Sequence, residues 1–128
     1  MAPMEISLYD RVGGMPFFEA LVDHFYDGVR ADGVLRPLYP EEDLGPAARR
    51  LTLFLAQYWG GPGTYSEERG HPRLRMRHVP FPIGGDERDR WMTHMRAAVE
   101  GSGADDATQA ELLGYFTMAA EAMRNQAR

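Results

Sequence analysis

Apolar residues recur every three to four positions along most of the chain, the spacing that places them on one face of an α-helix. Four segments carry this pattern, and glycine or proline separates each from the next. Alternation with a period of two is nearly absent, so the pattern predicts an all-α domain of four longer helices and two or three short ones. The residues that share an apolar helix face are Phe18, Leu21, Val22, Phe25 and Val29; Ala47, Leu51, Phe54, Leu55 and Tyr58; Trp91, Met92, Met95, Ala98 and Val99; and Leu112, Phe116, Ala119, Ala120 and Met123.

Proline and acidic residues predict where the helices begin. Pro16 and Pro46 suit the first turns of two long helices, and Asp86 is expected to cap the third. The last long helix is predicted from about Ala107 to Arg124. The shorter elements are expected to be helical turns at Leu8–Val12, capped by Ser7, at Val34–Tyr39 and from Pro72 to about Val79, with a polar loop over Pro62–His71.

The composition narrows the class of protein. With 128 residues the chain is long enough for one domain, residues 1–128, whose core needs no disulfide. The absence of cysteine excludes thiolate zinc sites and cysteine nucleophiles. A net charge of −5 argues against broad nucleic-acid binding. No apolar run approaches about 18 residues and no signal peptide is recognisable, so a cytoplasmic protein without an integral membrane segment is expected.

One short basic segment carries the clearest candidate for chemistry. In "RGHPRLRMRHVPFPI", residues 69–83, Leu74 lies one helical turn before His78, and Val79 and Phe81 follow it. An imidazole that projects from an apolar wall suits an axial ligand of haem iron. Arg75 and Arg77 flank it and have the cationic forks that bind propionates. The alternative is a solvated basic helix in which His78 only packs.

The other histidines are weaker candidates for a ligand. His24 and His94 lie within predicted long helices, where packing roles are expected, and His71 precedes Pro72 in a loop. No two histidines show the i,i+4 spacing that binds zinc, so a metal site made of protein alone is not expected.

Three aromatic side chains with a polar tip add to the haem hypothesis. Tyr26, Tyr39 and Trp91 each combine a ring suited to burial with one O–H or N–H donor. A buried donor needs an acceptor, and a diatomic ligand on iron would be one. The alternative is that each of them bonds a backbone carbonyl.

At this point the chain resembles a truncated haemoglobin of the second group, O type. The resemblance runs from about Ile6 to Arg124 and is most specific between residues 50 and 81. It implies a two-over-two helical sandwich, the truncated globin fold, that holds haem b, and it leaves residues 1–5 as a frayed N-terminal extension. The matching segments are "YDRVGG" at 9–14, "HFYDGV" at 24–29, "VLRPLYPEEDL" at 34–44, "RLTLFLAQYWGGPGTYSEERGHPRLRMRHVPF" at 50–81 and "RDRWM" at 88–92.

The resemblance also implies roles for individual residues. It makes His78 the proximal ligand of the iron and places Tyr26, Tyr39 and Trp91 on the distal side. Ala47 falls where larger globins often have a gating histidine. The resemblance places Leu51 and Phe54 near the haem. Together with the residues of the basic segment, it leads us to expect that Leu51, Phe54, Tyr65, Leu74 and Phe81 contact the cofactor, with Arg75 and Arg77 on the propionates, where the family varies.

Three donors around bound O2 would slow its release, so redox chemistry is a better hypothesis than oxygen delivery. We expect NO dioxygenase-like or peroxidase-like turnover of NO, peroxide or peroxynitrite, with CO as a further ligand and a separate reductase as electron source. The alternatives are an O2 carrier, a haem-based ligand sensor or a helical interaction module without a cofactor. The sequence leaves open whether the protein is a monomer or a homodimer.

Overall fold

The computed structural model describes residues 6–127, so the predicted N-terminal extension lies outside the described residues. The described part is entirely helical and contains no strand, which confirms the all-α prediction. None of its helices is both long and apolar enough to cross a membrane. The elements in chain order are α1 (Leu8–Arg11), α2 (Met15–Arg30), η1 (Arg36–Leu38), a 3-10 helix, α3 (Gly45–Tyr58), α4 (Thr64–Arg69), α5 (Leu74–His78), α6 (Gly85–Glu100) and α7 (Asp106–Ala122).

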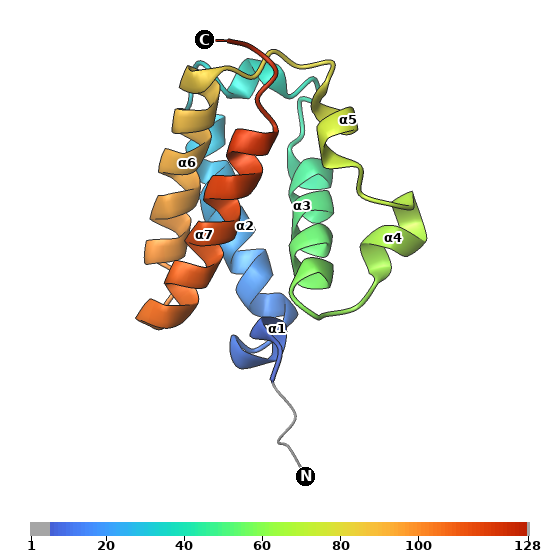
Figure 1. Cartoon of the computed structure of the whole chain (residues 1–128), viewed down its shortest axis with the longest axis vertical. Helices are drawn as coiled ribbons and strands as arrows, with labels where there is room; N and C mark the ends of the chain where they lie inside the picture. The colour runs from blue at the N-terminus through green and yellow to red at the C-terminus, as the bar shows by residue number, and fades with distance from the viewer. Residues whose placement is uncertain (1–5, 128) are drawn as a thin grey trace.

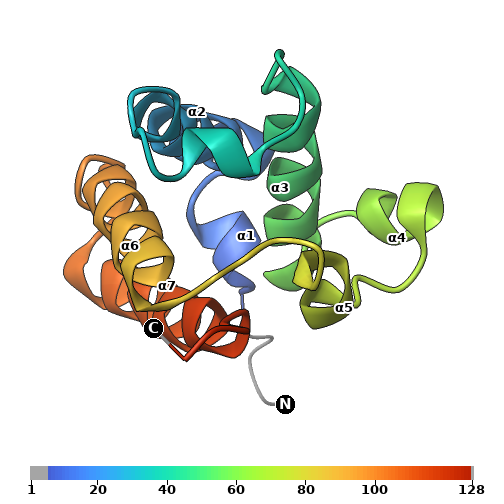
Figure 2. The same cartoon turned by 90° about the horizontal axis from the view of Figure 1, so that it is seen from above.

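The four long helices form two packed pairs. α2 packs against α3, α6 packs against α7, and α2 also contacts α6, so the pairs lie one over the other (Figures 1 and 2). This is the expected two-over-two sandwich. Figure 2 shows α4 on the outer side of α3 and α5 beside α3, on the side toward α7. The largest fully buried side chains are Phe18, Leu21, Phe25, Leu55, Met95, Leu112 and Phe116.

The predicted helix boundaries hold in part. Ser7 does cap α1, because its Oγ accepts a hydrogen bond from the Asp10 N–H at 3.1 Å. The prediction that Asp86 caps α6 is wrong. The cap is Gly84, two residues earlier, so α6 begins at Gly85, and the Glu87 carboxylate accepts from the Gly84 N–H at 2.7 Å.

The polar segment predicted as a loop over Pro62–His71 contains a helix, α4. Its sequence, "TYSEER", has only Tyr65 as a buried residue, so periodicity could not reveal it. The two short turns are shorter than predicted: η1 is confined to Arg36–Leu38, and α5 to Leu74–His78.

Two glycine positions allow close packing between elements. A Cβ on Gly60 would lie 2.6 Å from the Ser7 Cβ, and one on Gly61 would lie 2.6 Å from the Tyr9 ring. Gly60 also has φ +102°, which favours glycine. The pair therefore lets α1 lie directly against the end of α3, where the Tyr9 N–H donates to the Trp59 carbonyl at 3.0 Å.

Candidate functional site

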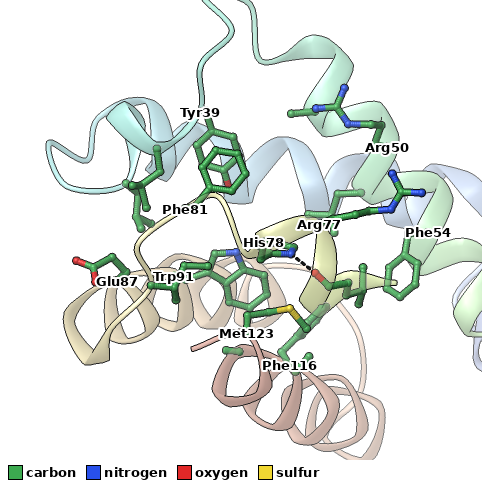
Figure 3. A pocket seen from close by; sticks show the side chains of 18 of the residues that line it. Tyr39, Arg50, Phe54, Arg77, His78, Phe81, Glu87, Trp91, Phe116 and Met123 are labelled. Atoms are coloured by element: carbon green, nitrogen blue, oxygen red, sulfur yellow. Dashed lines mark hydrogen bonds between the residues drawn. The ribbon is translucent and has the colours of Figure 1, made fainter. Parts of the chain in front are cut away.

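A cavity of about 490 Å³ opens between α3, α5, α6, α7 and the segment around η1. This volume lies within the range of about 300–1,000 Å³ that is usual for small-molecule and cofactor sites. Its wall is largely apolar, with polar groups at a few points (Figure 3). Of the twelve predicted site residues, eleven line this cavity: Tyr26, Tyr39, Ala47, Leu51, Phe54, Tyr65, Leu74, Arg77, His78, Phe81 and Trp91.

His78 is the last residue of α5 and presents one defined nitrogen for metal binding. Its Nδ1 lies 2.6 Å from the Leu74 carbonyl oxygen, drawn as the dashed line in Figure 3. A carbonyl oxygen only accepts, so Nδ1 carries the proton and Nε2 keeps its lone pair. This is the arrangement in which a histidine ligand has its tautomer fixed by the hydrogen bond of its other nitrogen.

The segment that follows His78 is fastened by Asn125, a residue that the sequence analysis did not single out. The Asn125 side-chain amide donates to the carbonyl oxygens of Phe81, at 2.8 Å, and His78, at 3.3 Å. Its Oδ1 accepts from the Ile83 N–H at 2.9 Å. The backbone N–H of Asn125 in turn donates to the Ile83 carbonyl at 2.8 Å. The chain just after α7 therefore fixes the exit from the helix that carries the histidine.

Three aromatic donors come together from other elements. Tyr26 lies on α2, Tyr39 directly after η1, and Trp91 on α6. The Tyr26 and Tyr39 rings meet edge to face with centroids 5.7 Å apart, and Phe25 packs between this pair and Trp91. Burial raises the pKa of Tyr26, as do the charge and the hydrogen bond of Tyr39. Burial likewise raises the pKa of Tyr39, so both phenols keep their protons and remain donors.

Two of these three donors, Tyr39 and Trp91, have no acceptor among the described residues of the protein. Tyr26 donates toward the Tyr39 hydroxyl. Among residues 6–127, no backbone carbonyl accepts a hydrogen bond from Tyr26, Tyr39 or Trp91, whereas the backbone contacts of many other side chains are well formed. The alternative that each donor bonds a carbonyl therefore does not describe this part of the chain. The Tyr39 O–H and the Trp91 N–H are left facing a cavity.

A buried ion-pair cluster supports the elements that carry these donors. Asp32 follows α2, and its side chain is only 5% exposed. Its carboxylate accepts from the N–H groups of Val34 and Leu35, from His94 Nε2 at 2.7 Å and from Arg90 at 3.2 Å. The cluster ties the turn before η1 to α6, one helical turn beyond Trp91. His94 is thus a packing residue, as expected.

The same cluster shifts the pKa of Asp32 and brings α6 close to α2. Burial acts to raise the pKa of Asp32, but the hydrogen bonds from His94, Leu35 and Val34 and the charge of Arg90 together lower it well below its usual range. The His94 ring lies so close to α2 that a Cβ on Gly28 would be 2.3 Å from its Nδ1. Only glycine fits there without displacing the paired histidine.

Two arginine side chains on the cavity wall, Arg77 and Arg69, have no acidic partner among the described residues. Arg77 lines it and donates to the carbonyls of Pro72, at 2.7 Å, and Arg69, at 3.0 Å, but no carboxylate within the described residues pairs with it. Arg69 also lines the cavity without an acidic partner among these residues, and the sequence analysis missed it as a site residue. Arg75 does not line the cavity and lies on a separate shallow depression beside Met76 and Val79.

This pocket fits haem in its chemistry. It offers one imidazole nitrogen with a free lone pair, an apolar wall for the porphyrin, and arginines without acidic partners for the propionates. Two further arginines on the wall are already paired, Arg50 with Glu41 at 3.2 Å and Arg88 with Asp89 at 3.0 Å. Arg69 and Arg77 are therefore the side chains best placed to hold the propionates.

The sequence model of the bacterial-like globins matches residues 7–125. The group 2 truncated haemoglobin YjbI of Bacillus subtilis (strain 168) is 41% identical over 113 residues, which cover 88% of this chain and 85% of that protein.

Solved structures agree with this assignment. A thermostable haemoglobin from the actinobacterium Thermobifida fusca superposes with a TM-score of 0.94 at 58% identity, covering 96% of this chain and all of that chain. The truncated oxygen-avid haemoglobin of Bacillus subtilis superposes with a TM-score of 0.88 at 38% identity, covering 94% of this chain and 100% of that one. Membership of such a family implies a haem iron cofactor and diatomic gas ligands. The chain belongs to the bacterial-like globin family, as a group II truncated haemoglobin.

Proposed function

We propose that the protein binds haem b, with His78 as the axial ligand, and that Tyr26, Tyr39 and Trp91 hydrogen-bond a diatomic ligand in the cavity. The haem iron, when bound, supplies O2 binding and electron transfer. The observation that carries the proposal is that two donors without protein acceptors, Tyr39 and Trp91, meet in a cavity lined by a histidine whose Nε2 is free, with Tyr26 orienting the Tyr39 hydroxyl. Arg69 and Arg77 would hold the propionates, and Ala47 leaves space beside Leu51 for a small ligand to enter.

The donors act on the lifetime of the ligand. Each hydrogen bond to a charged acceptor contributes about 1.5–3 kcal/mol. A net stabilisation of about 2.8 kcal/mol slows escape about 100-fold if the entry rate is unchanged. Because the phenols of Tyr26 and Tyr39 keep their protons, they remain donors throughout the neutral pH range. An oxygen-avid relative with the same fold supports this direction of effect.

Slow release favours redox work over oxygen delivery. We propose turnover of NO, peroxide or peroxynitrite in the cytoplasm, with electrons from a separate reductase. In such turnover, preorganised donors stabilise negative charge as it develops on the ligand. The tyrosine and indole protons stay on the protein, so these side chains bind and orient the ligand.

Replacing Trp91 by phenylalanine tests the proposal, because it keeps a ring and deletes the N–H. We expect O2 release measured by stopped flow to become roughly tenfold faster or more, the effect of losing about 1.4 kcal/mol. Tyr115→Phe is the matched control, since it also removes one donor from the cavity wall but outside the Tyr26–Tyr39–Trp91 group. An unchanged rate in Trp91→Phe, or rapid release from the parent protein, would instead favour an O2 carrier.

A further inference from the structure

Two tyrosines in ring-to-ring contact, Tyr115 and Tyr58, lie between the cavity and the protein surface. Tyr115, on α7, lines the cavity. Its ring centroid lies 4.1 Å from that of Tyr58, the last residue of α3, with the planes 33° apart. Tyr58 is 50% exposed. The chain has six tyrosines, all within the described residues, and only the side chain of Tyr58 is largely exposed to solvent. The cavity wall and the solvent are therefore one ring-to-ring contact apart.

The hydroxyl groups of Tyr115 and Tyr58 differ in how readily they release a proton to water. Burial raises the pKa of Tyr115 to about 12, and the neighbouring Tyr58 adds to the shift. Tyr115 therefore holds its proton tightly. Tyr58 faces water, which accepts a proton at once when an electron is removed from the phenol. If an electron were taken from this pair at the cavity side, it would be replaced from Tyr58, and the neutral phenoxyl radical would remain there.

We propose that Tyr58 is a surface oxidation site for phenolic donors that are too large to enter the cavity, with Tyr115 as the relay. The proposal rests on the proposed reaction of the protein with peroxide. Reduction of hydrogen peroxide to two water molecules consumes two electrons and two protons. Each electron leaves Tyr58 through Tyr115 toward the haem, and the Tyr58 O–H bond breaks with its proton released to water. A phenolic donor then gives a hydrogen atom to the Tyr58 oxygen, which restores the tyrosine and leaves a donor radical.

In the absence of a donor, the same site predicts a distinct product. Two Tyr58 radicals on different molecules couple by forming a carbon–carbon bond between their rings, and each ring loses one proton. The product is a dityrosine-linked dimer. Trp59 touches both tyrosines, with centroids 5.0 Å from Tyr58 and 5.2 Å from Tyr115, but it is only 8% exposed and cannot make this link.

The first experiment adds hydrogen peroxide to the ferric protein without a reductant. Dityrosine fluorescence and a covalent dimer on a denaturing gel are expected, with the cross-link mapped to Tyr58 by mass spectrometry. Tyr58→Phe should abolish the dimer while the haem spectrum still responds to peroxide. Tyr115→Phe should also suppress the dimer, although Tyr58 is intact. Tyr9→Phe is the control, because Tyr9 is stacked on Phe18 and does not line the cavity. A dimer that persists in Tyr58→Phe, or that is lost equally in Tyr9→Phe, overturns the proposal.

Donor oxidation is tested in the same samples with tyramine coupled to dextran, a phenol too large to enter. Its peroxide-driven cross-linking should be lost in Tyr58→Phe, whereas oxidation of a small phenol is retained. Equal loss for both donors would mean that Tyr58 serves the pocket rather than the surface.

A second experiment separates the relay from the peroxide reaction. The protein is loaded with zinc protoporphyrin and illuminated with a cobalt(III) ammine complex, which takes an electron from the excited porphyrin. The porphyrin should then be refilled from Tyr115 and Tyr58, giving the same dimer without peroxide. If illumination yields the Tyr58 dimer but the ferric protein ignores peroxide, the proposed peroxide function fails and the relay stands. If the ferric protein reacts with peroxide but neither treatment gives a dimer dependent on Tyr58, the relay is wrong.

Discussion

The two groups of residues that face the cavity are held in place by different means. Tyr26 and Trp91 lie on helices of 16 residues each, whose buried faces form the core. His78 lies on a helix of five residues that has no buried residue of its own. The Arg77 and Asn125 side chains donate to backbone carbonyls just before and at the end of this short helix, those of Pro72 and His78. The donor side is thus stabilised by packing, and the histidine side by a few specific polar contacts.

This difference predicts which substitutions will destabilise each side of the cavity. Isolated helices shorter than about 12–15 residues are marginal in water, so α5 depends on its tertiary contacts. A single side chain can therefore alter the histidine segment without disturbing the core. The elements that carry Tyr26, Tyr39 and Trp91 should be destabilised only by substitutions that disrupt the buried cluster around Asp32. Four substitutions test this comparison, and they are given from the largest expected effect to the smallest.

Replacing His78 by alanine should have the largest effect, and it should fall on the cofactor and not on the fold. Loss of residues that only support a metal ligand costs about 10–100-fold in affinity, so loss of the ligand itself should cost at least about 100-fold. Haemin titration followed by absorption measures this. Added imidazole should restore the spectrum, because it can occupy the vacated space. His24→Ala, at an exposed position, is the control. Unaltered spectra in His78→Ala would rule out the assigned ligand.

Replacing Asp32 by asparagine should destabilise the donor side by about 2–4 kcal/mol, because His94 and Arg90 lose their buried anionic partner. Urea unfolding measures the free energy. The folded-state pKa of Asp32 is lowered, so its contribution is fully present above its unfolded pKa of about 3.9 and is lost as the pH falls through the folded value. The difference in free energy of unfolding between the parent protein and Asp32→Asn should therefore be constant near neutral pH and should disappear in acid.

The matched control for Asp32 is Asp27→Asn in the last turns of the preceding helix, α2. Asp27 pairs with Arg30 at the surface, where the carboxylate side chain is 74% exposed, so little change in unfolding free energy is expected. Equal losses in both variants would show that the Asp32 cluster is no more than a surface ion pair.

Replacing Asn125 by alanine should cost less, about 1–2 kcal/mol, because its hydrogen bonds are exposed. The effect should be local: hydrogen exchange at the Ile83 amide should become faster, while amides in the core of α2 stay protected. In the haem-loaded protein the iron–histidine vibration should shift. Gln126→Ala is the control, since Gln126 contacts this segment only through its backbone N–H. A uniform change in exchange across the protein would contradict a local role.

Replacing Arg73 by glycine should have the smallest effect and the opposite sign. Arg73 precedes α5 with φ 45°, a left-handed conformation that costs an L-residue about 1–2 kcal/mol. Glycine adopts it freely but loses about 0.5–1 kcal/mol in chain entropy, so a net gain of about 0.5 kcal/mol is expected in thermal or urea unfolding. Arg75→Gly, inside the helix, should lose about 1 kcal/mol. Similar losses in both would mean that the turn is not strained.

The long helices and most of the cavity wall were predictable from the sequence, because apolar periodicity reports burial directly. The short segments were less so. α4 has one buried residue, Tyr65, and its helical state depends on Gln57, whose side chain bonds Ser66 at 2.8 and 2.9 Å. The start of α6 was misplaced because a glycine precedes it and the acceptor, Glu87, lies within its first turn.

The cation assignment failed for a geometric reason. Successive residues of an α-helix are about 100° apart, so His78 lies about 40° and Arg77 about 60° from Leu74 around α5, whereas Arg75 is about 100° away. Arg77 therefore shares the cavity face and Arg75 does not. Arg69 was missed because α4 was not expected. Asn125 gave no signal at all, since its contacts join residues 42 to 47 positions apart in the sequence.

The hydrogen bond from Asn125 to the His78 carbonyl has a consequence for how the protein folds during synthesis. The histidine emerges from the ribosome 47 residues before the asparagine that binds its carbonyl oxygen. Because domains form from the N-terminus onward during synthesis, α2 and α3 can associate while the segment around His78 still has an untethered end. The hydrogen bond from Asn125 can therefore form only once translation has passed residue 125, so the histidine side of the cavity is the last part of the site to be completed.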